Sequence, residues 1–301
     1  PAFAARQSAA RLRASRTMSA TPGRERLFLR LDGDASHAPE TTVPGSTLSD
    51  IEVPAELRAV VAHVTVYEER FADGHETVER VVPDGAARVL VSLADDAVAV
   101  HVAGASTKPA VVRMGGHVHG LSVTLRPGGT HALFGIPADE LAGQVVPWDR
   151  IAPVAHGELT AQLASAPHAA NRIAQLLAAL RTLHRPHAAA TTSVIREATR
   201  HLAQSTDARP VRTLAADLSL SERRVQQLFA SQLGVTPSAW RRLQRVHTVI
   251  RRLRARDTSQ WSRLALEAGF YDQAHFINEF RAHVGLTPGQ FHARVADSSN
   301  P

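Results

Sequence analysis

The spacing of apolar residues along the chain changes from the alternation of strands to the repeat of helices. Before residue 157, short β-branched runs such as ARVLVSL (87–93) and VAVHVAG (98–104) are separated by turn residues at short intervals. LSVTL (121–125) alternates apolar and polar residues, and RPGG ends it. Such alternation with closely spaced turns is typical of strands in a small barrel or sandwich. We therefore expect a β-rich region over residues 24–157.

A helical segment and a linker are predicted over residues 158–190. Five apolar residues recur there at helical spacing: Ile173, Leu176, Leu177, Leu180 and Leu183. HRPHAAA (184–190) interrupts the pattern, and helical spacing returns from Thr191 to about residue 295. A stripe this short either forms a dimer seam or packs on the β-rich region, and the sequence leaves both alternatives open.

The C-terminal part contains an internal repeat. LAADLSLSERRVQQLFASQLGVTP (214–237) and LALEAGFYDQAHFINEFRAHVGLTP (264–288) agree at matching positions. The shared landmarks are Leu220 and Phe270, Phe229 and Phe280, Gly234 and Gly285, and Pro237 and Pro288. Each copy predicts a short helix, a tight turn and a second helix that ends at the glycine. The chain therefore carries two predicted helix-turn-helix motifs, at about residues 211–233 and 262–284.

The turn inside each motif explains why the helical pattern stops and resumes within a few residues. Gly269 stands where the first helix must end sharply, and glycine accepts the positive φ of such a turn without steric cost. Ser219 occupies the matching position of the first copy and is a less suitable residue there. Ser221 and Asp272 are the predicted N-caps of the second helices.

The second copy, ALEAGFYDQAHFINEFRAHVGLTPGQF, resembles the C-terminal signature of AraC/XylS-type transcription regulators. Residues 81–85 (VVPDG) and 125–151 resemble an N-terminal domain common in actinobacterial regulators of this type. The resemblance implies an α+β multidomain protein with a β-rich, cupin-like sensor domain for an unidentified small-molecule effector. It also implies a C-terminal all-α DNA-binding domain over residues 191–297, with double-stranded DNA as its partner.

The resemblance also assigns the DNA contacts, position by position. The implied base-contacting residues are Arg223, Gln226, Gln227, Gln273, His275 and Asn278. The implied phosphate-contacting residues are Ser221, Arg224, Arg241, Arg242, Arg251 and Arg252. Arginine can hold guanine, and glutamine adenine, through paired hydrogen bonds. A predicted helix over residues 238–256, roughly 25 Å long, would set the two reading helices near one DNA turn of about 34 Å apart.

The charge distribution agrees with a polyanion partner for the C-terminal region. Residues 191–301 carry 16 Arg and 9 acids, a net +7, whereas residues 18–190 carry 14 basic and 19 acidic residues, a net −5. Residues 1–17 add four Arg, and we expect residues 1–23 to be a disordered leader, or an upstream extension if Met18 is the natural start. No apolar run approaches the length of a membrane span, so we expect a cytoplasmic protein.

Enzymatic alternatives have little support in the sequence. The chain has no cysteine, which excludes thiolate chemistry and the alkyl-acceptor function of some relatives. His117 and His119 share a strand face, which leaves a metal-dependent cupin-type enzyme fused to a DNA-binding module as one alternative. Further ligands at matching spacing are missing, so we expect no metal, cofactor or catalytic residue. Another alternative is a constitutive DNA-binding protein whose β domain only dimerises. An activator would also need a surface for RNA polymerase, which no sequence feature marks.

Overall fold

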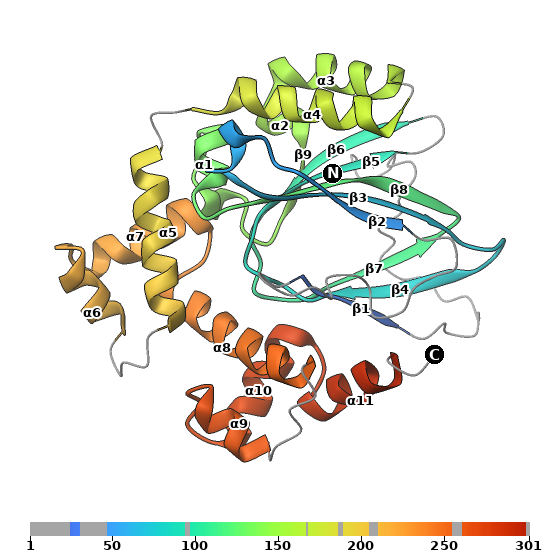
Figure 1. The fold of residues 1–301 in the computed structure, drawn as a ribbon. Helices are drawn as coiled ribbons and strands as arrows, with labels where there is room; N and C mark the ends of the chain where they lie inside the picture. Colours follow the sequence, from blue (N-terminus) through green and yellow to red (C-terminus); the bar gives the residue numbers. More distant parts are fainter. Residues whose placement is uncertain are drawn as a thin grey trace, which may run out of the picture.

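The computed structural model describes residues 25–30, 47–93, 97–166, 168–185, 189–204, 210–254 and 261–298. A β-rich region comes first along the chain, and helices follow it (Figure 1). The strands are β1 Arg26–Phe28, β2 Thr47–Ile51, β3 Val61–Arg70, β4 Glu76–Val81, β5 Arg88–Leu93, β6 Val98–Ala103, β7 Ala110–Gly115, β8 His117–Leu125 and β9 Val145–Pro147. The predicted division into a β-rich N-terminal region and a helical C-terminal region is confirmed.

The helices complete this division. Those within or next to the β-rich region are η1 Ala55–Leu57, α1 Gly129–Phe134, η2 Ala138–Glu140, α2 Trp148–Ile151, α3 Pro153–Ser165 and α4 Ala169–Leu183. The C-terminal ones are α5 Ala189–Gln204, α6 Pro210–Asp217, α7 Glu222–Leu233, α8 Pro237–Arg254, α9 Trp261–Glu267, α10 Gln273–Val284 and α11 Pro288–Ser298. None of the helices in the described ranges is long and apolar enough to cross a membrane.

Two sheets form the β-rich region. One has six strands in the order β2-β3-β8-β5-β6-β9, and the other has three in the order β1-β4-β7, where β1 runs parallel to β4. In the larger sheet Val91 lies opposite Leu121 and Val89 opposite Val123, and all four side chains are buried. Alternation along β5 and β8 therefore puts every second residue into one core. The cupin-like character of this region stays a prediction.

The apolar stripe of the segment before the linker packs on the β-rich region of its own chain. Leu176, Leu177 and Leu180 of α4 are buried in the same cluster as the sheet residues Val91 and Leu121. In Figure 1 the antiparallel pair α3 and α4 lies over the β5–β6 end of the sheet. The sequence left open whether this stripe forms a dimer seam or packs on the β-rich region. In the structure it packs on the β-rich region.

Two further cores hold the C-terminal helices. Residues of α5, α6 and α7 form one cluster, and residues of α8, α9, α10 and α11 form another. The helix α8 joins them; its 18 residues correspond to about 27 Å. Each cluster thus contains one complete predicted helix-turn-helix motif, and α8 sets the distance between the two.

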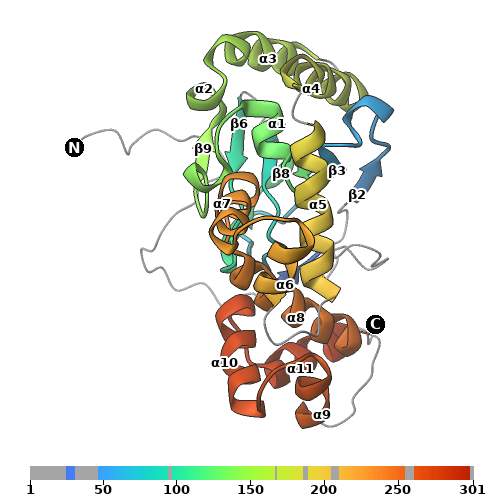
Figure 2. The same ribbon diagram turned by 90° about the vertical axis from the view of Figure 1, so that its left-hand side faces the viewer.

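Both motifs also contact the β-rich region, which the sequence did not predict. The amide of Gly128 donates to the Gln232 carbonyl at the end of α7 (3.1 Å). His247 of α8 donates from Nε2 to the Pro83 carbonyl (2.8 Å). In the second motif, His283 of α10 has its Nδ1 2.6 Å from the Thr107 carbonyl. Figures 1 and 2 show the helical part running along one side and the lower end of the sheets. The β-rich region thus contacts α7, the middle of α8 and α10.

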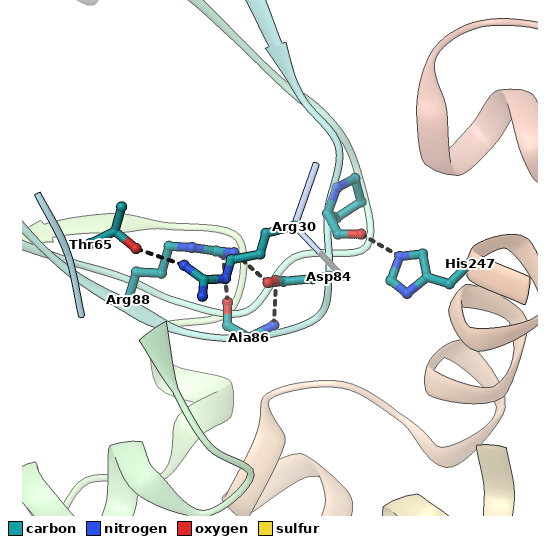
Figure 3. A network of polar contacts seen from close by, with 7 residues as sticks. Arg30, Thr65, Asp84, Ala86, Arg88 and His247 are labelled. Carbon is teal, nitrogen blue, oxygen red and sulfur yellow. Dashed lines mark hydrogen bonds and ion pairs between the residues drawn. The ribbon is translucent and has the colours of Figure 1, made fainter. Parts of the chain in front are cut away.

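The loop that receives His247 is held by its own polar contacts (Figure 3). The Asp84 carboxylate accepts a hydrogen bond from the Ala86 amide (2.9 Å) and is paired with Arg88. These bonds fix the turn after β4, so that the Pro83 carbonyl points at the imidazole. Burial lowers the pKa of His247 from 6.5 to about 4, and the nearby Arg251 and His283 act in the same direction, against Asp84 and the hydrogen bond to Pro83. The packed state therefore keeps this histidine neutral.

The docking of α8 should weaken in acid. A base whose pKa is lowered in the packed state binds fewer protons there, so its stabilisation is complete above about pH 6.5 and is lost as the pH falls toward 4. The free energy of unfolding, measured in urea, should fall over this range more steeply than in His247→Gln, which keeps an N–H donor but does not titrate. The difference should approach about 1.4 kcal/mol per pH unit. Equal slopes for both proteins would contradict this assignment.

Candidate nucleic-acid interface

The second helix of the first motif, α7, buries one side and exposes the other. Ser221 caps it, because its hydroxyl oxygen accepts the Arg224 amide (3.2 Å), and Gly234 ends it with a φ of 78°. Val225 and Phe229 are fully buried at a spacing of four residues. The predicted base-contacting residues of this helix, Arg223, Gln226 and Gln227, are all exposed. The structure therefore brings them together on the solvent side of α7.

The helix α10 of the second motif repeats this arrangement. The Asp272 carboxylate accepts the His275 amide (2.7 Å), and Gly285 ends the helix with a φ of 78°. Phe276 and Phe280 are fully buried, and their rings meet at a centroid distance of 5.7 Å. The predicted base-contacting residues on this helix, Gln273, His275 and Asn278, are exposed. In both motifs the second helix, α7 or α10, therefore exposes a polar face to solvent.

The turns of the two motifs have the same backbone geometry although their sequences differ. Gly269 has a φ of 80°, and Ser219 is the one residue other than glycine with positive φ (54°) in the described chain. In each motif the amide after the turn residue bonds back five residues: Leu220 to Ala215 (2.8 Å) and Phe270 to Ala265 (2.9 Å). Phe270 is buried and Leu220 half-buried, so each turn also places an apolar anchor between its helices.

The predicted phosphate-contacting residues differ in exposure and in their partners. Ser221, Arg224, Arg242 and Arg251 are exposed, Arg241 and Arg252 are half-buried, and the Ser221 hydroxyl serves as the cap. Arg242 lies 3.5 Å from Glu279, and Arg252 is paired with Glu267. Surface ion pairs of this kind contribute roughly 0–1 kcal/mol each, so either arginine can exchange its carboxylate for a phosphate at small cost.

Two residues near α10 were not singled out from the sequence. Glu279 lies 3.9 Å from His275 and 3.5 Å from His283, so one carboxylate touches both a predicted base reader and a residue that contacts the β-rich region. The sequence signal that could have identified Glu279 is its spacing of four residues from each histidine, which makes side chains neighbours on a helix. Tyr271, just before the cap, is 87% exposed, although tyrosine is commonly half-buried.

The two histidines of β8, His117 and His119, contact each other and Glu68. The rings of His117 and His119 stack at 4.2 Å, and His117 Nε2 lies 2.9 Å from a Glu68 oxygen. The contact with His117 lowers the pKa of Glu68. Over the ranges that the structure describes, no group of three or more His, Asp or Glu side chains is arranged to hold a metal ion.

Similarity to known proteins agrees with this geometry. Residues 214–294 match the family model described as "Helix-turn-helix domain", and residues 50–147 match "Domain of unknown function (DUF6597)". No curated protein sequence matches the chain.

Similar solved structures include ToxT from Vibrio cholerae, with 8% identity over 77% of this chain and 97% of that chain and a TM-score of 0.37. ToxT bound to (E)-4-(8-methylnaphthalen-1-yl)but-3-enoic acid has 10% identity, coverages of 77% and 98%, and a TM-score of 0.37. ToxT with an unsaturated fatty acid bound has 11% identity, coverages of 77% and 95%, and a TM-score of 0.33. These TM-scores are too low to support a conclusion about this chain.

Residues 214–294 therefore form a helix-turn-helix domain, in which the second helix of each motif, α7 or α10, exposes a polar face.

The turn of the first motif should be under strain that glycine would relieve. A positive φ costs a side-chain-bearing residue roughly 1–2 kcal/mol, whereas glycine pays mainly in the entropy of the unfolded chain. Ser219→Gly should therefore raise the free energy of unfolding by about 0.5 kcal/mol, and Gly269→Ala should lower it by about 1 kcal/mol. Urea unfolding followed by circular dichroism measures both.

A matched control is Ala216→Gly at an exposed position inside α6, where glycine should cost about 1 kcal/mol. If Ser219→Gly were as destabilising as this control, the turn would not be strained.

Proposed function

We propose that this protein is a transcription regulator of the AraC type that binds DNA sequence-specifically and reads two successive major grooves, one with α7 and one with α10. The observation that carries the proposal is that both helices expose their polar faces while the motifs remain packed on the β-rich region. The joining helix α8, about 27 Å long, is of the right size to set two reading helices near one turn of about 34 Å apart. A single chain would then recognise two blocks on one side of the duplex.

In this proposal the exposed residues of α7 and α10 divide into readers and positioners. Arg223 is suited to guanine, and Gln226, Gln227 and Gln273 to adenine, because each can make two hydrogen bonds to a base edge. The exposed Arg224 and Arg251 contact phosphates, which fixes the register of the protein without reading sequence.

We assign the chain's regions to separate tasks. Residues 191–297 bind double-stranded DNA, residues 24–157 sense a small molecule, and residues 158–190 connect them. In this proposal the protein acts in the cytoplasm. An open cavity of about 260 Å³ beside β2 and β3 is the candidate place for this small molecule. Its lining carries both signs of charge, from Asp50, Glu52, Arg58 and Arg126, together with His63 and apolar residues of β2 and β3. Such a lining suits a small polar effector rather than a hydrocarbon.

A ligand for the folded β-rich region raises the melting temperature of the protein, so a thermal-shift screen of small polar metabolites tests the sensing role. Shifts that Arg58→Gln abolishes would place the ligand in this cavity. A constitutive DNA-binding protein would show no such shift while its DNA binding stayed intact.

Replacing Arg223 should change the sequence preference and not only the affinity. Arg223→Ala should lose about 1–3 kcal/mol against the preferred site and relax the preference at one base position, because the paired hydrogen bonds to one base disappear. Selection from a random DNA library, scored by the logo of the bound fraction, measures both effects.

The neighbouring Arg224→Ala is the matched control on the same helix. It should weaken all sequences about equally and lower the salt slope of binding by about 1, with an unchanged logo. An unaltered logo for Arg223→Ala would remove Arg223 from the reading role.

A further inference from the structure

Residues 25–30, here called the strap, lie between the β-rich region and the second helix-turn-helix motif. Three of them form β1, the edge strand beside β4, and Figure 1 shows this strand between β4 and the helices α8 and α11. The strap contacts β4 through backbone pairing, including the Val82 amide, which donates to the Phe28 carbonyl (2.8 Å). So short a strand has few backbone bonds, and its side chains must supply most of the attachment.

Two arginines of the strap, Arg26 and Arg30, hold it to the rest of the β-rich region. The Arg26 guanidinium is buried and lies 2.6 Å from a Glu79 oxygen and 2.7 Å from a Glu69 oxygen. Arg30 lies 2.7 Å from Asp50 and donates to the Thr65 hydroxyl (2.8 Å; Figure 3). This arginine is an anchor, since removing it would leave the buried Glu69 and Glu79 carboxylates without a compensating positive charge.

The odd-numbered side chains of the strap face the DNA-binding domain. Leu27 and Leu29 are 1% and 0% exposed and belong to the buried cluster formed by α8, α9, α10 and α11. Of the three buried residues that the β-rich region adds to this cluster, Leu27, Leu29 and Val82, two come from the strap. Glu25 extends the same contact, because it pairs with Arg80 of β4 (2.7 Å) and with Arg294 of α11 (2.9 Å). Strand alternation thus divides the strap between two partners.

One buried nitrogen of the Arg26 anchor lacks a hydrogen-bond partner in the described part of the chain. Arg26 Nη1 is buried and has no hydrogen-bond partner among the described residues. One guanidinium also faces two carboxylates, and burial raises the pKa of Glu79 against the effect of Arg26. A buried donor without a partner costs free energy, so the docked strap is less stable than its burial alone would suggest.

We propose that the second helix-turn-helix motif has a dedicated docking surface for the strap, and that this contact fixes the motif's position relative to the first motif. The first motif docks separately, through the Gly128–Gln232 hydrogen bond and the close approach of Gly234 to Ala138. With the strap in place the β-rich region braces both motifs; without it, α8 and the remaining polar contacts hold the second motif. The docking is independent of DNA, whereas its consequence, a fixed spacing between the two blocks of the binding site, rests on the proposed function.

Spin labels test the docking without DNA. Because the chain has no cysteine, introduced cysteines at exposed positions label uniquely: Ser49→Cys on β2 paired with Ala282→Cys on α10, or with Ala216→Cys on α6. In the otherwise unchanged protein both pairs should give narrow distance distributions. Leu27→Ala/Leu29→Ala should broaden the 49–282 distribution, with an undocked fraction raised about tenfold or more, and leave the 49–216 distribution narrow.

Leu266→Ala is the matched control, because Leu266 is a leucine of the same motif but is 62% exposed; it should leave both distributions narrow. Two narrow distributions in the double variant would overturn the proposal, and so would equal broadening of both pairs, since the strap would then not act on the second motif alone. Far-ultraviolet circular dichroism confirms that the variant is folded. If the labels behave as expected but selected DNA sites show no paired blocks, the strap stands and the proposed DNA reading fails.

Discussion

The structure depends on the burial of one aromatic or aliphatic stripe in each recognition helix. Val225 and Phe229 in α7, and Phe276 and Phe280 in α10, are fully removed from solvent. In each helix, the buried pair fixes the rotation of the helix about its own axis. The pair therefore determines which residues of that helix point outward. The caps at Ser221 and Asp272 fix where each helix begins. The residues proposed to read DNA are thus positioned by packing on the opposite side of the helix, and they lie on its exposed side.

Much of this arrangement could be predicted from the sequence because it is local. The turn at Gly269, the cap at Asp272 and the terminating Gly285 are contacts within a few residues, and the repeat at Ser219, Ser221 and Gly234 supplies an independent check. Strand alternation in β5 and β8 is equally local. The helix predicted over residues 238–256 also matches α8, whose observed bounds are Pro237–Arg254.

The packing between regions could not be predicted, since it joins residues far apart in sequence. His247 meets Pro83 across 164 positions, and His283 meets Thr107 across 176. A lone histidine in a helical pattern gives no sign of its partner. The contacts of the strap could likewise not be predicted. Residues 25–30 adjoin a segment expected to be a leader, and they are too few to show periodicity. Its role follows from burial of Leu27 and Leu29, which only the folded chain reveals.

The molecule therefore combines two helix-turn-helix motifs with a β-rich region that contacts both. In the proposed function, this arrangement couples a signal in the β-rich region to the relative position of α7 and α10. The central claim is that these helices read two successive grooves. Selection of genomic fragments by the purified protein at near-physiological salt tests it most directly. The account predicts enrichment of a site with two preferred blocks about ten base pairs apart. Weak binding that is lost steeply with salt, with no shared motif, would contradict it, because phosphate attraction alone would then be acting.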